Sequence, residues 1–405
     1  MWLERFFKKK MIAAVLLMVG LSLFSVATMI RTFPEIIHSV RDSQFMKTSD
    51  RISDVNLRIN ENVVFREGFI NLFGYLQVLM DKNEENNFEV VKDTDGRQHF
   101  TFFTSEPSPS EEFVKRMAKF QREVEDEKTS LLYIMSPDKA IAGKTEFPTG
   151  IPYSYANETA DEFLAGLAKK GVAYLDLRET LLDSGIAYDE LFYQADHHWT
   201  TETAFWAFQQ VVAAMEEDSG MALDAEHLYT DRDNYNTLFY PQAFVGSMAR
   251  KAGIYYGGTD DFTFIWPKFK TDYEYSFSDR SDLMENGPWP GEFGHVLMYA
   301  DAFVDKKDLS IAGDLSGIYL WGNHAMAQVV NKKNVDGPKV LFYKDSMMLP
   351  VAAFTSTVCS EVYLLDPRYY KGDIVAFAKQ MDFDYIFMSL SPASLTDEFF
   401  PFYRE

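Results

Sequence analysis

The sequence has little cysteine and little positive charge, and each shortage excludes a class of protein. Its only cysteine, Cys359, has no partner for an intrachain disulfide and forms no Cys-x-x-Cys metal pair. It lies in a run of small residues, which favours a buried packing role. Lys and Arg number 39 against 61 Asp and Glu, for a formal net charge of −22. This balance argues against binding nucleic acid or an anionic membrane surface, because both need clustered basic side chains.

The sequence does contain enough apolar material for a large folded core. Of its 405 residues, 47% are hydrophobic and 16% are aromatic. A chain of this length and composition can bury a core in one large domain or in two. We therefore expect a folded protein rather than a disordered one.

One hydrophobic run near the N-terminus is long enough to cross a membrane. Residues 11–30 carry no charge, and at the helical rise this run covers the roughly 30 Å of hydrocarbon in a bilayer. Residues 1–10 hold four basic residues, whereas only Arg31 follows the run closely. The positive-inside rule then predicts a cytoplasmic basic tail (1–10), a transmembrane signal anchor (11–30) and an extracytoplasmic bulk. We expect a single-pass protein of the cell membrane.

A cleaved signal peptide is the alternative interpretation of this run. Ser25-Val26-Ala27 resembles a small-residue cleavage site. The apolar run continues past that site to Ile30, which favours the uncleaved anchor.

The remaining chain divides by pattern at about residue 129. Residues 31–128 mix amphipathic and polar stretches and are expected to form a stalk or peripheral region. Residues 129–405 alternate short apolar runs with helical periodicity, interrupted at 217–338 by a segment rich in Tyr, Phe, Gly and Asp. Strands are expected at 131–135, 172–177, 340–343, 362–365 and 385–388, and helices at 158–170, after Thr200, from Ser346 through Phe354 and at 374–379. Such alternation predicts an α/β fold, a parallel sheet flanked by helices with a strand- and loop-rich insertion.

The segment Asp196-His197-His198-Trp199-Thr200 has the arrangement of a general base before a helix. A serine hydroxyl becomes a nucleophile when an imidazole takes its proton, and a carboxylate must hold that imidazole in one tautomer. Asp196 and His198 fit these roles, and Ser346 after the run 340–343 is the candidate nucleophile. A serine at a strand-to-helix turn also has backbone N–H groups directed at a developing oxyanion.

Structural roles remain open for several of these residues. An Asp-Ser pair before a helix is also an ordinary N-cap, and Arg368 has Asp366 as a nearby ion-pair partner. A metal site at Asp196, His197 and His198 is disfavoured, because adjacent histidines on an extended chain are expected to point apart. Trp199 is expected to be a packing residue.

Several motifs together resemble a known family. The segment 196–200 resembles the signature of the DHHW family, which is similar to the alginate O-acetyltransferases AlgJ and AlgX. Further family-like blocks are Ser136-Pro137-Asp138-Lys139, Gly246-Ser247, Gly322-Asn323, Lys344-Asp345-Ser346 and Asp366-Pro367-Arg368-Tyr369-Tyr370. The resemblance implies a permuted SGNH-hydrolase-like fold in which Asp-x-His precedes the serine.

The resemblance also implies roles for individual residues. Ser346 becomes the nucleophile, His198 the base and Asp196 the residue that orients it. Substrate-binding or oxyanion residues are expected among Arg368, Asn323, Lys139 and Tyr370. Two departures leave the oxyanion donors open: Lys344 stands where many hydrolases of this fold have Gly, and Ser389-Leu390-Ser391 replaces a Gly-x-Asn-Asp block. Asn323 or the Ser346 backbone N–H would substitute.

The function that this resemblance implies is extracytoplasmic O-acetyl transfer to a cell-surface or secreted polysaccharide through an acetyl-serine. A multi-pass membrane O-acyltransferase is the expected acetyl donor, and no cofactor or metal is expected. Aromatic side chains of the insertion, such as Trp266, Tyr255, Tyr256 and Trp289, are either sugar-stacking surfaces or core packing. Two other functions remain open: a carbohydrate esterase with the same triad, and a non-catalytic polysaccharide-binding or assembly subunit.

Overall fold

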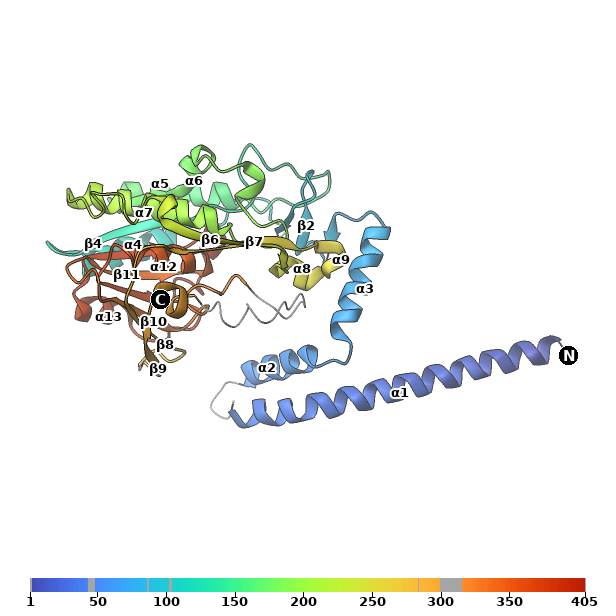
Figure 1. The fold of residues 1–405 in the computed structure, drawn as a ribbon. Coiled ribbons are helices and arrows are strands. Elements are labelled where there is room, and N and C mark those ends of the chain that lie inside the picture. The colour runs from blue at the N-terminus through green and yellow to red at the C-terminus, as the bar shows by residue number, and fades with distance from the viewer. Residues whose placement is uncertain are drawn as a thin grey trace. The chain divides into compact units, whose positions relative to one another are not determined.

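The computed structural model of the chain describes residues 2–42, 48–85, 87–101, 104–282, 284–298 and 315–404. The chain divides into two compact units, Met1–Phe73 and Gly74–Glu405. Its helices are α1 (Trp2–Asp42), α2 (Thr48–Glu61), α3 (Arg66–Leu79), α4 (Glu111–Val124), α5 (Ala156–Lys170), α6 (Leu177–Thr180), α7 (Thr201–Ser219), α8 (Ser247–Ala252), α9 (Ile254–Gly257), α10 (Phe293–Val296), α12 (Leu349–Thr355) and α13 (Ile374–Met381) (Figure 1).

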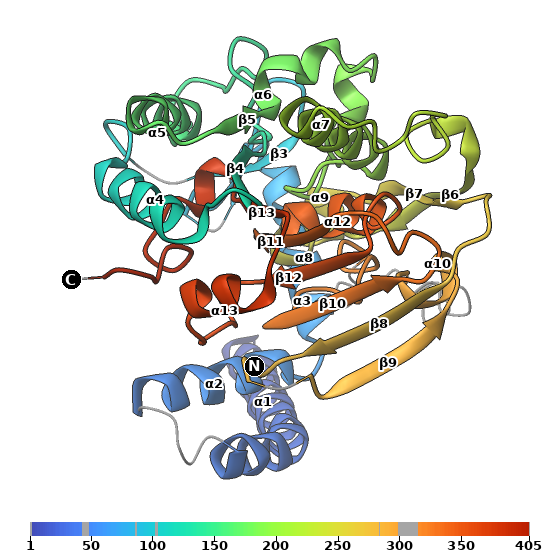
Figure 2. The same ribbon diagram turned by 90° about the vertical axis from the view of Figure 1, so that its left-hand side faces the viewer.

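The strands form one large sheet and two small ones in the second unit (Figure 2). They are β1 (Glu84–Glu85), β2 (Val90–Lys92), β3 (Gln98–Phe100), β4 (Ser130–Met135), β5 (Tyr174–Asp176), β6 (Tyr235–Phe244), β7 (Asp260–Pro267), β8 (Tyr273–Ser278), β9 (Asn286–Gly291), β10 (Met326–Asn331), β11 (Lys339–Lys344), β12 (Glu361–Leu365) and β13 (Tyr385–Ser389).

In the first unit, α2 packs against the C-terminal part of α1. α1 has the length and apolar composition needed to cross a membrane, as the run at 11–30 predicts. The Ser39 hydroxyl donates a hydrogen bond to Asp54, and the Arg58 guanidinium lies 3.8 Å from the Glu35 carboxylate. Past the end of α2, the Val64 N–H reaches the Thr28 hydroxyl at 3.5 Å. The chain therefore returns to the level of the apolar run before α3 begins.

The central sheet of the second unit has the order β5-β4-β13-β11-β12-β10-β8-β9. Its first five strands are parallel, which confirms the predicted α/β fold. The strands β10, β8 and β9 extend it by antiparallel pairing. They come from the segment 217–338, so part of this expected insertion contributes strands to the central sheet. The same segment supplies the separate β6–β7 pair.

Helices cover both faces of the parallel strands. Successive side chains of each strand point to opposite faces, so both sets of side chains are buried. On one face, Phe342 and Phe387 pack in the core cluster that includes Phe205 and Phe208 of α7 and Phe354 of α12. The other face has its own cluster, which contains Leu341 and Ile386 from the same strands together with Phe120 of α4, Phe163 of α5 and Ile374 of α13. The continuous apolar runs of the sequence are thus explained by burial on two sides.

The parallel strands carry the predicted motifs at their carboxyl ends. β4 ends before Ser136-Pro137-Asp138-Lys139, and β11 ends before Asp345-Ser346. β12 ends before Asp366-Pro367-Arg368, and β13 ends before Ser391. These strands are neighbours in the sheet, so the motifs meet at one edge, where ligand sites of open α/β sheets lie.

Candidate active site

The turn after β11 presents Ser346 at the start of a helix. Asp345 is the N-cap, since its Oδ1 accepts a hydrogen bond from the Met347 N–H at 3.1 Å. Its Oδ2 accepts from the Ser391 N–H at 2.7 Å and from the Ser394 hydroxyl at 2.9 Å. The expected capping role of Asp345 is confirmed. The carboxylate also joins the nucleophile turn to the segment that follows β13.

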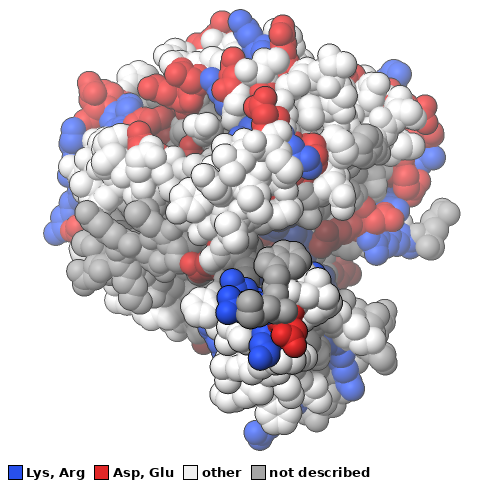
Figure 3. All heavy atoms as spheres, turned by 90° about the vertical axis from the view of Figure 1, so that its right-hand side faces the viewer, with Lys and Arg blue, Asp and Glu red and all other residues white. Residues whose placement is uncertain are grey.

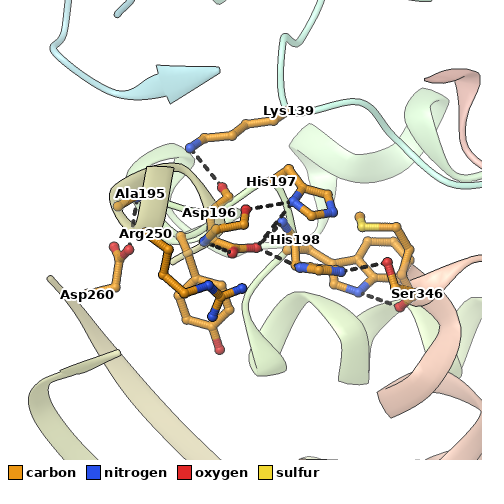
Figure 4. Close-up of polar contacts among 12 residues, drawn as sticks. Lys139, Ala195, Asp196, His197, His198, Arg250, Asp260 and Ser346 are labelled. Carbon is orange, nitrogen blue, oxygen red and sulfur yellow. Dashed lines mark hydrogen bonds and ion pairs between the residues drawn. The ribbon is translucent and has the colours of Figure 1, made fainter. Parts of the chain in front are cut away.

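Ser346, His198 and Asp196 form a continuous hydrogen-bonded chain (Figure 4). His198 Nε2 lies 2.8 Å from Ser346 Oγ, and His198 Nδ1 lies 2.6 Å from Asp196 Oδ1. The structure thus brings the three residues together in the order predicted from the sequence, across 148 positions between His198 and Ser346. With Nδ1–H donated to the carboxylate, Nε2 is free to accept the serine proton.

The Asp196 carboxylate is fully buried and receives three hydrogen bonds. His198 supplies two donors, its backbone N–H at 2.8 Å and its ring Nδ1. The third donor is the backbone N–H of Ser247, at 2.5 Å from Asp196 Oδ2. Burial alone would raise the pKa of Asp196. The charges of His198 and His197 and these hydrogen bonds outweigh burial and hold the pKa well below its ordinary value, so the carboxylate is ionised.

Gly246 allows the start of α8 to approach this carboxylate. A Cβ at Gly246 would lie 2.1 Å from the Ala195 carbonyl oxygen and 2.7 Å from the Asp196 Cβ, both closer than van der Waals contact. Behind it, the Met248 N–H donates to the same Ala195 carbonyl at 3.1 Å. The Gly246-Ser247 motif therefore has a structural reason: only glycine lets Ser247 reach Asp196.

The two histidines lie side by side rather than apart. Their ring centroids are 3.9 Å apart, so the expectation that they point in opposite directions is wrong. Ser247 contacts both Asp196 and His197, which explains this arrangement. Its Oγ lies 3.0 Å from His197 Nδ1, and its backbone N–H donates to Asp196. Among the described residues, Asp196, His197 and His198 form a group whose ligand atoms fall within 4.8 Å of one another, as a metal ion would need. Protein groups already engage the carboxylate oxygens, His197 Nδ1 and both nitrogens of His198, which favours the triad.

Lys139 and Asp260 fix the backbone before His198. The Lys139 ammonium donates to the carbonyls of Gln194 at 2.7 Å and Asp196 at 3.0 Å. The Asp260 carboxylate accepts from the N–H groups of Gln194 at 2.6 Å and Ala195 at 2.9 Å. Burial lowers the pKa of Lys139 to about 8, although Asp260 and Asp196 act in the opposite direction. Lys139 thus holds the Asp-His segment from beside the cleft.

A buried ion cluster lies under the nucleophile turn. The Asp366 carboxylate accepts hydrogen bonds from Arg368 Nε at 2.9 Å and Nη2 at 2.6 Å, and Lys344 Nζ lies 3.3 Å away. Lys344 Nζ also donates to Asn323 Oδ1 at 2.6 Å. Burial would raise the pKa of Asp366, but Lys344 and Arg368 hold it below its ordinary value. Lys344 stands in place of glycine because its ammonium completes this cluster.

Ser346 opens onto a cleft of about 470 Å³. Lys139, Arg368 and His197 line it, and so does the segment from Ser391 to Thr396. Its other wall is unexpected, because His99, Phe100, Thr101 and Ser108 come from the region expected to be a stalk. His99 is buried and bonded through Nε2 to Asp93 Oδ2 at 2.8 Å. The local sequence pattern of residues 93–108 does not predict that residues of this region line the cleft.

Two of the predicted site residues lie elsewhere. Tyr370 packs in the core cluster around α13 and lines a different cavity, of about 700 Å³, with Tyr343. Asn323 contacts Lys344, and among the described residues that line the Ser346 cleft neither Asn323 nor Tyr370 is found. Asn323 therefore supports Lys344 in the structure rather than facing the cleft.

The aromatic side chains of the insertion also lie away from this cleft. Tyr256 is 3% exposed and packs with Met248 and Ala252, which is the core-packing alternative. Trp289 is half-buried and stacks on Trp321 with centroids 5.0 Å apart. Neither these two nor Trp266 and Tyr255 occur among the described residues of the cleft lining. Trp199 is buried as expected, and its Nε1–H also donates to the Met347 carbonyl at 3.0 Å.

Comparison with known proteins agrees with this geometry. Residues 99–253 match the family described as the SGNH hydrolase-like domain of the acetyltransferase AlgX. Over this segment the chain is therefore similar to SGNH hydrolase-like domains. The matched segment includes Asp196, His198 and Gly246-Ser247 and ends before Ser346, which the structure brings to 2.8 Å from His198. The resemblance predicted from the sequence motifs is confirmed.

Solved structures share the fold of this chain at low sequence identity. A DHHW family protein from Eubacterium siraeum DSM 15702 is 17% identical with a TM-score of 0.57, over 78% of this chain and 96% of that one. Bacillus cereus PatB1 with a sulfonyl adduct is 15% identical with a TM-score of 0.61, over 76% of this chain and 97% of that one. None of the curated proteins is significantly similar to this chain.

We predict that Gly246→Ala will lower turnover by a factor on the order of 10², because displacement of a catalytic group by about 1 Å costs that much. The added Cβ must move α8 away from Ala195, and the Ser247 N–H then leaves Asp196. Hydrolysis of an aryl acetate by the full chain in detergent measures this. Gly68→Ala is the control, since a Cβ there meets nothing within 4 Å. Equal rates for both variants would contradict the role of α8.

A second prediction concerns pH. The pKa of Lys139 is about 8 in the folded protein against an ordinary 10.5, so the unfolded chain binds more protons between these values. The free energy of unfolding should therefore rise from pH 8 to pH 10.5 by about 3 kcal/mol relative to Lys139→Met. Denaturant titration of the full chain in detergent, followed by tryptophan fluorescence, measures the difference. Lys333→Met, which removes an exposed lysine, is the control, and parallel curves for wild type and Lys139→Met would refute the prediction.

Proposed function

We propose that this protein is an extracytoplasmic O-acetyltransferase that acetylates hydroxyl groups of a cell-surface or secreted polysaccharide. The observation that carries the proposal is the chain of hydrogen bonds from Ser346 through His198 to the buried Asp196, with Ser346 lining a cleft. The match to the domain of the acetyltransferase AlgX supports acyl transfer as the reaction. The sulfonyl adduct held by Bacillus cereus PatB1 is consistent with a reactive nucleophile in this fold.

The reaction proceeds in two steps at Ser346. In the first, His198 Nε2 takes the hydroxyl proton while Ser346 Oγ attacks the acetyl carbonyl of the donor, and that proton then passes to the departing donor oxygen. In the second, His198 takes the proton of a sugar hydroxyl, whose oxygen attacks the acetyl-serine. The bond between the acetyl carbon and Ser346 Oγ breaks, and the serine recovers its proton from His198.

The negative charge of each tetrahedral intermediate needs nearby donors. Ser346 opens the helical turn 346–348, so its backbone N–H is among the first-turn groups that have no intrahelical acceptor. Arg368 lines the same cleft and carries a positive charge. We assign the Ser346 N–H to the oxyanion and Arg368 to substrate positioning.

The acetyl donor and the membrane anchor belong to the same proposal. We propose that α1 anchors the chain in the cell membrane with residues 1–10 in the cytoplasm, as the basic residues before the apolar run indicate. Acetyl groups made available inside the cell would then have to cross the bilayer. A multi-pass membrane O-acyltransferase fits this task as the partner that delivers the acetyl group, because one span cannot form a pore.

The nucleophile is tested by substitution. We expect Ser346→Ala to lower aryl acetate turnover by the full chain by ~10³ or more, and Asp196→Asn by a factor on the order of 10³, since the asparagine holds His198 in the wrong tautomer. A sulfonyl fluoride should inactivate the wild type, with the label found on Ser346 by peptide mass spectrometry. Ser360→Ala, at the amino end of β12, is the control. Undiminished turnover in Ser346→Ala would remove the triad from the mechanism.

Transferase and esterase differ only in whether a sugar hydroxyl or water attacks the acetyl-serine. We expect a saturating oligosaccharide acceptor, supplied with an aryl acetate donor, to yield acetylated sugar faster than free acetate. Chromatography of the sugar product and assay of acetate measure the two rates. If the protein strips acetyl groups from acetylated polysaccharide and forms no sugar ester, it is an esterase.

A further inference from the structure

The short helix α3 presents apolar side chains to the outside over much of its surface. No charged residue occurs between Glu67 and Asp81. The exposed side chains include Phe69 (53%), Leu72 (54%), Phe73 (50%), Leu76 (45%), Val78 (45%) and Leu79 (64%). A helix of a water-soluble protein confines such residues to one buried stripe, and an exposed apolar surface of this extent marks an interaction site.

Among the described residues, only a narrow stripe of α3 is buried, and the exposed rings of Phe69 and Tyr75 lie beside those of Phe24 and Tyr255. Gly74 and Gln77 are the residues of α3 that are buried among those described. A Cβ at Gly74 would lie 2.2 Å from the Ala252 carbonyl oxygen of α8, so this glycine permits close packing of the two helices. The exposed residues lie outside this stripe. Intramolecular packing therefore does not account for the apolar composition of α3.

The length of α3 excludes a membrane span. Its 14 residues extend about 21 Å at the helical rise, against roughly 30 Å of hydrocarbon. Apolar helices of this length are more often buried core helices or re-entrant or interfacial membrane segments. The exposure of Leu72 and Leu79 excludes a core helix and leaves a segment associated with the membrane.

Contacts inside the N-terminal unit place the start of α3 beside the apolar run of α1. The ring of Phe69 lies 5.8 Å from that of Phe24, and the Val64 N–H reaches the Thr28 hydroxyl. Phe24 and Thr28 both belong to the run 11–30. Phe24 comes six residues before the end of that run, which is about 9 Å along a helix. Interfacial helices bury their apolar side chains ~5–10 Å below the membrane surface, the same depth.

We propose that α3 lies in the outer boundary of the bilayer, with its exposed apolar side chains among lipid acyl chains. This inference rests on the proposed anchoring by α1. The exposed apolar residues are spread around the helix rather than gathered in one groove. Lipid, which surrounds a helix as a solvent does, can contact all of them, whereas a single protein partner would cover one side. Lipid is therefore the occupant. The formal charge of −22 fits an uncharged lipid surface rather than an anionic one, and Figure 3 shows Asp and Glu side chains over the upper part of one face.

The test uses the full chain with single cysteines at exposed sites. Leu72→Cys, Leu76→Cys and Leu79→Cys are spin-labelled and reconstituted in phosphatidylcholine vesicles, while Cys359, fully buried, stays unlabelled. References are Val19→Cys in the apolar run and Val335→Cys in a loop, where Val335 is 68% exposed. We expect the ratio of collision with oxygen to collision with a water-soluble nickel chelate to be several-fold higher at the three α3 positions than at Val335→Cys.

Each other outcome overturns the inference in a distinguishable way. Water-like labels on α3 with a lipid-like label at Val19→Cys would leave the anchor intact and reject the position of α3. A water-like label at Val19→Cys would reject the anchor itself. Spin–spin broadening between copies would assign the surface to a second copy of the chain. Labels that are water-like in vesicles and shielded from both reagents in native membranes would assign it to a protein partner.

Discussion

The buried charge of Asp196 is the constraint on which the geometry of the site depends. An ionised carboxylate without exposed surface costs several kcal/mol unless hydrogen-bond donors surround it. His198 supplies two donors from the adjacent chain, but the third, the Ser247 N–H, comes from α8. That donor arrives only because Gly246 can touch Ala195. The need to stabilise this buried charge therefore fixes the position of α8, the glycine at position 246 and the tautomer of His198.

Two further carboxylates stabilise the other half of the site in the same manner. Asp366 gathers Lys344 and Arg368 at the ends of β11 and β12. Asp345 binds the Ser391 N–H and the first turn of the helix that begins with Ser346. Both carboxylates are buried, and both oxygens of each accept hydrogen bonds. Ser346 is therefore held by groups that have few alternative arrangements. Ser346 and His198, the proposed nucleophile and base, thus approach one another from separately braced elements, as catalysis by preorganised groups requires.

The sequence revealed those features whose cause is local. Apolar runs at β4, β11, β12 and β13 identify strands because burial on both faces leaves no polar position. Thr200 was identifiable as an N-cap, and its hydroxyl accepts from the Thr203 N–H at 3.3 Å. The Asp196-x-His198 spacing likewise indicated a carboxylate beside an imidazole, and the two-residue offset lets both the N–H and the ring of His198 reach Asp196. The apolar run 11–30 was equally legible from composition alone.

Tertiary structure decided what depends on contacts between distant segments. The approach of α8 to the Asp-His segment decides that the Ser247 N–H binds Asp196 and that His197 lies against His198. The turn after β4 brings Lys139 to two backbone carbonyls of the same segment. The cleft wall at residues 99–101 and the addition of β10, β8 and β9 to the sheet were hidden for the same reason. The spacing of apolar residues shows which side of a helix or strand is buried, but it does not show which other element covers that side. The sequence alone determined the strands, the apolar run and the candidate triad, and only folding decided which groups hold that triad in place.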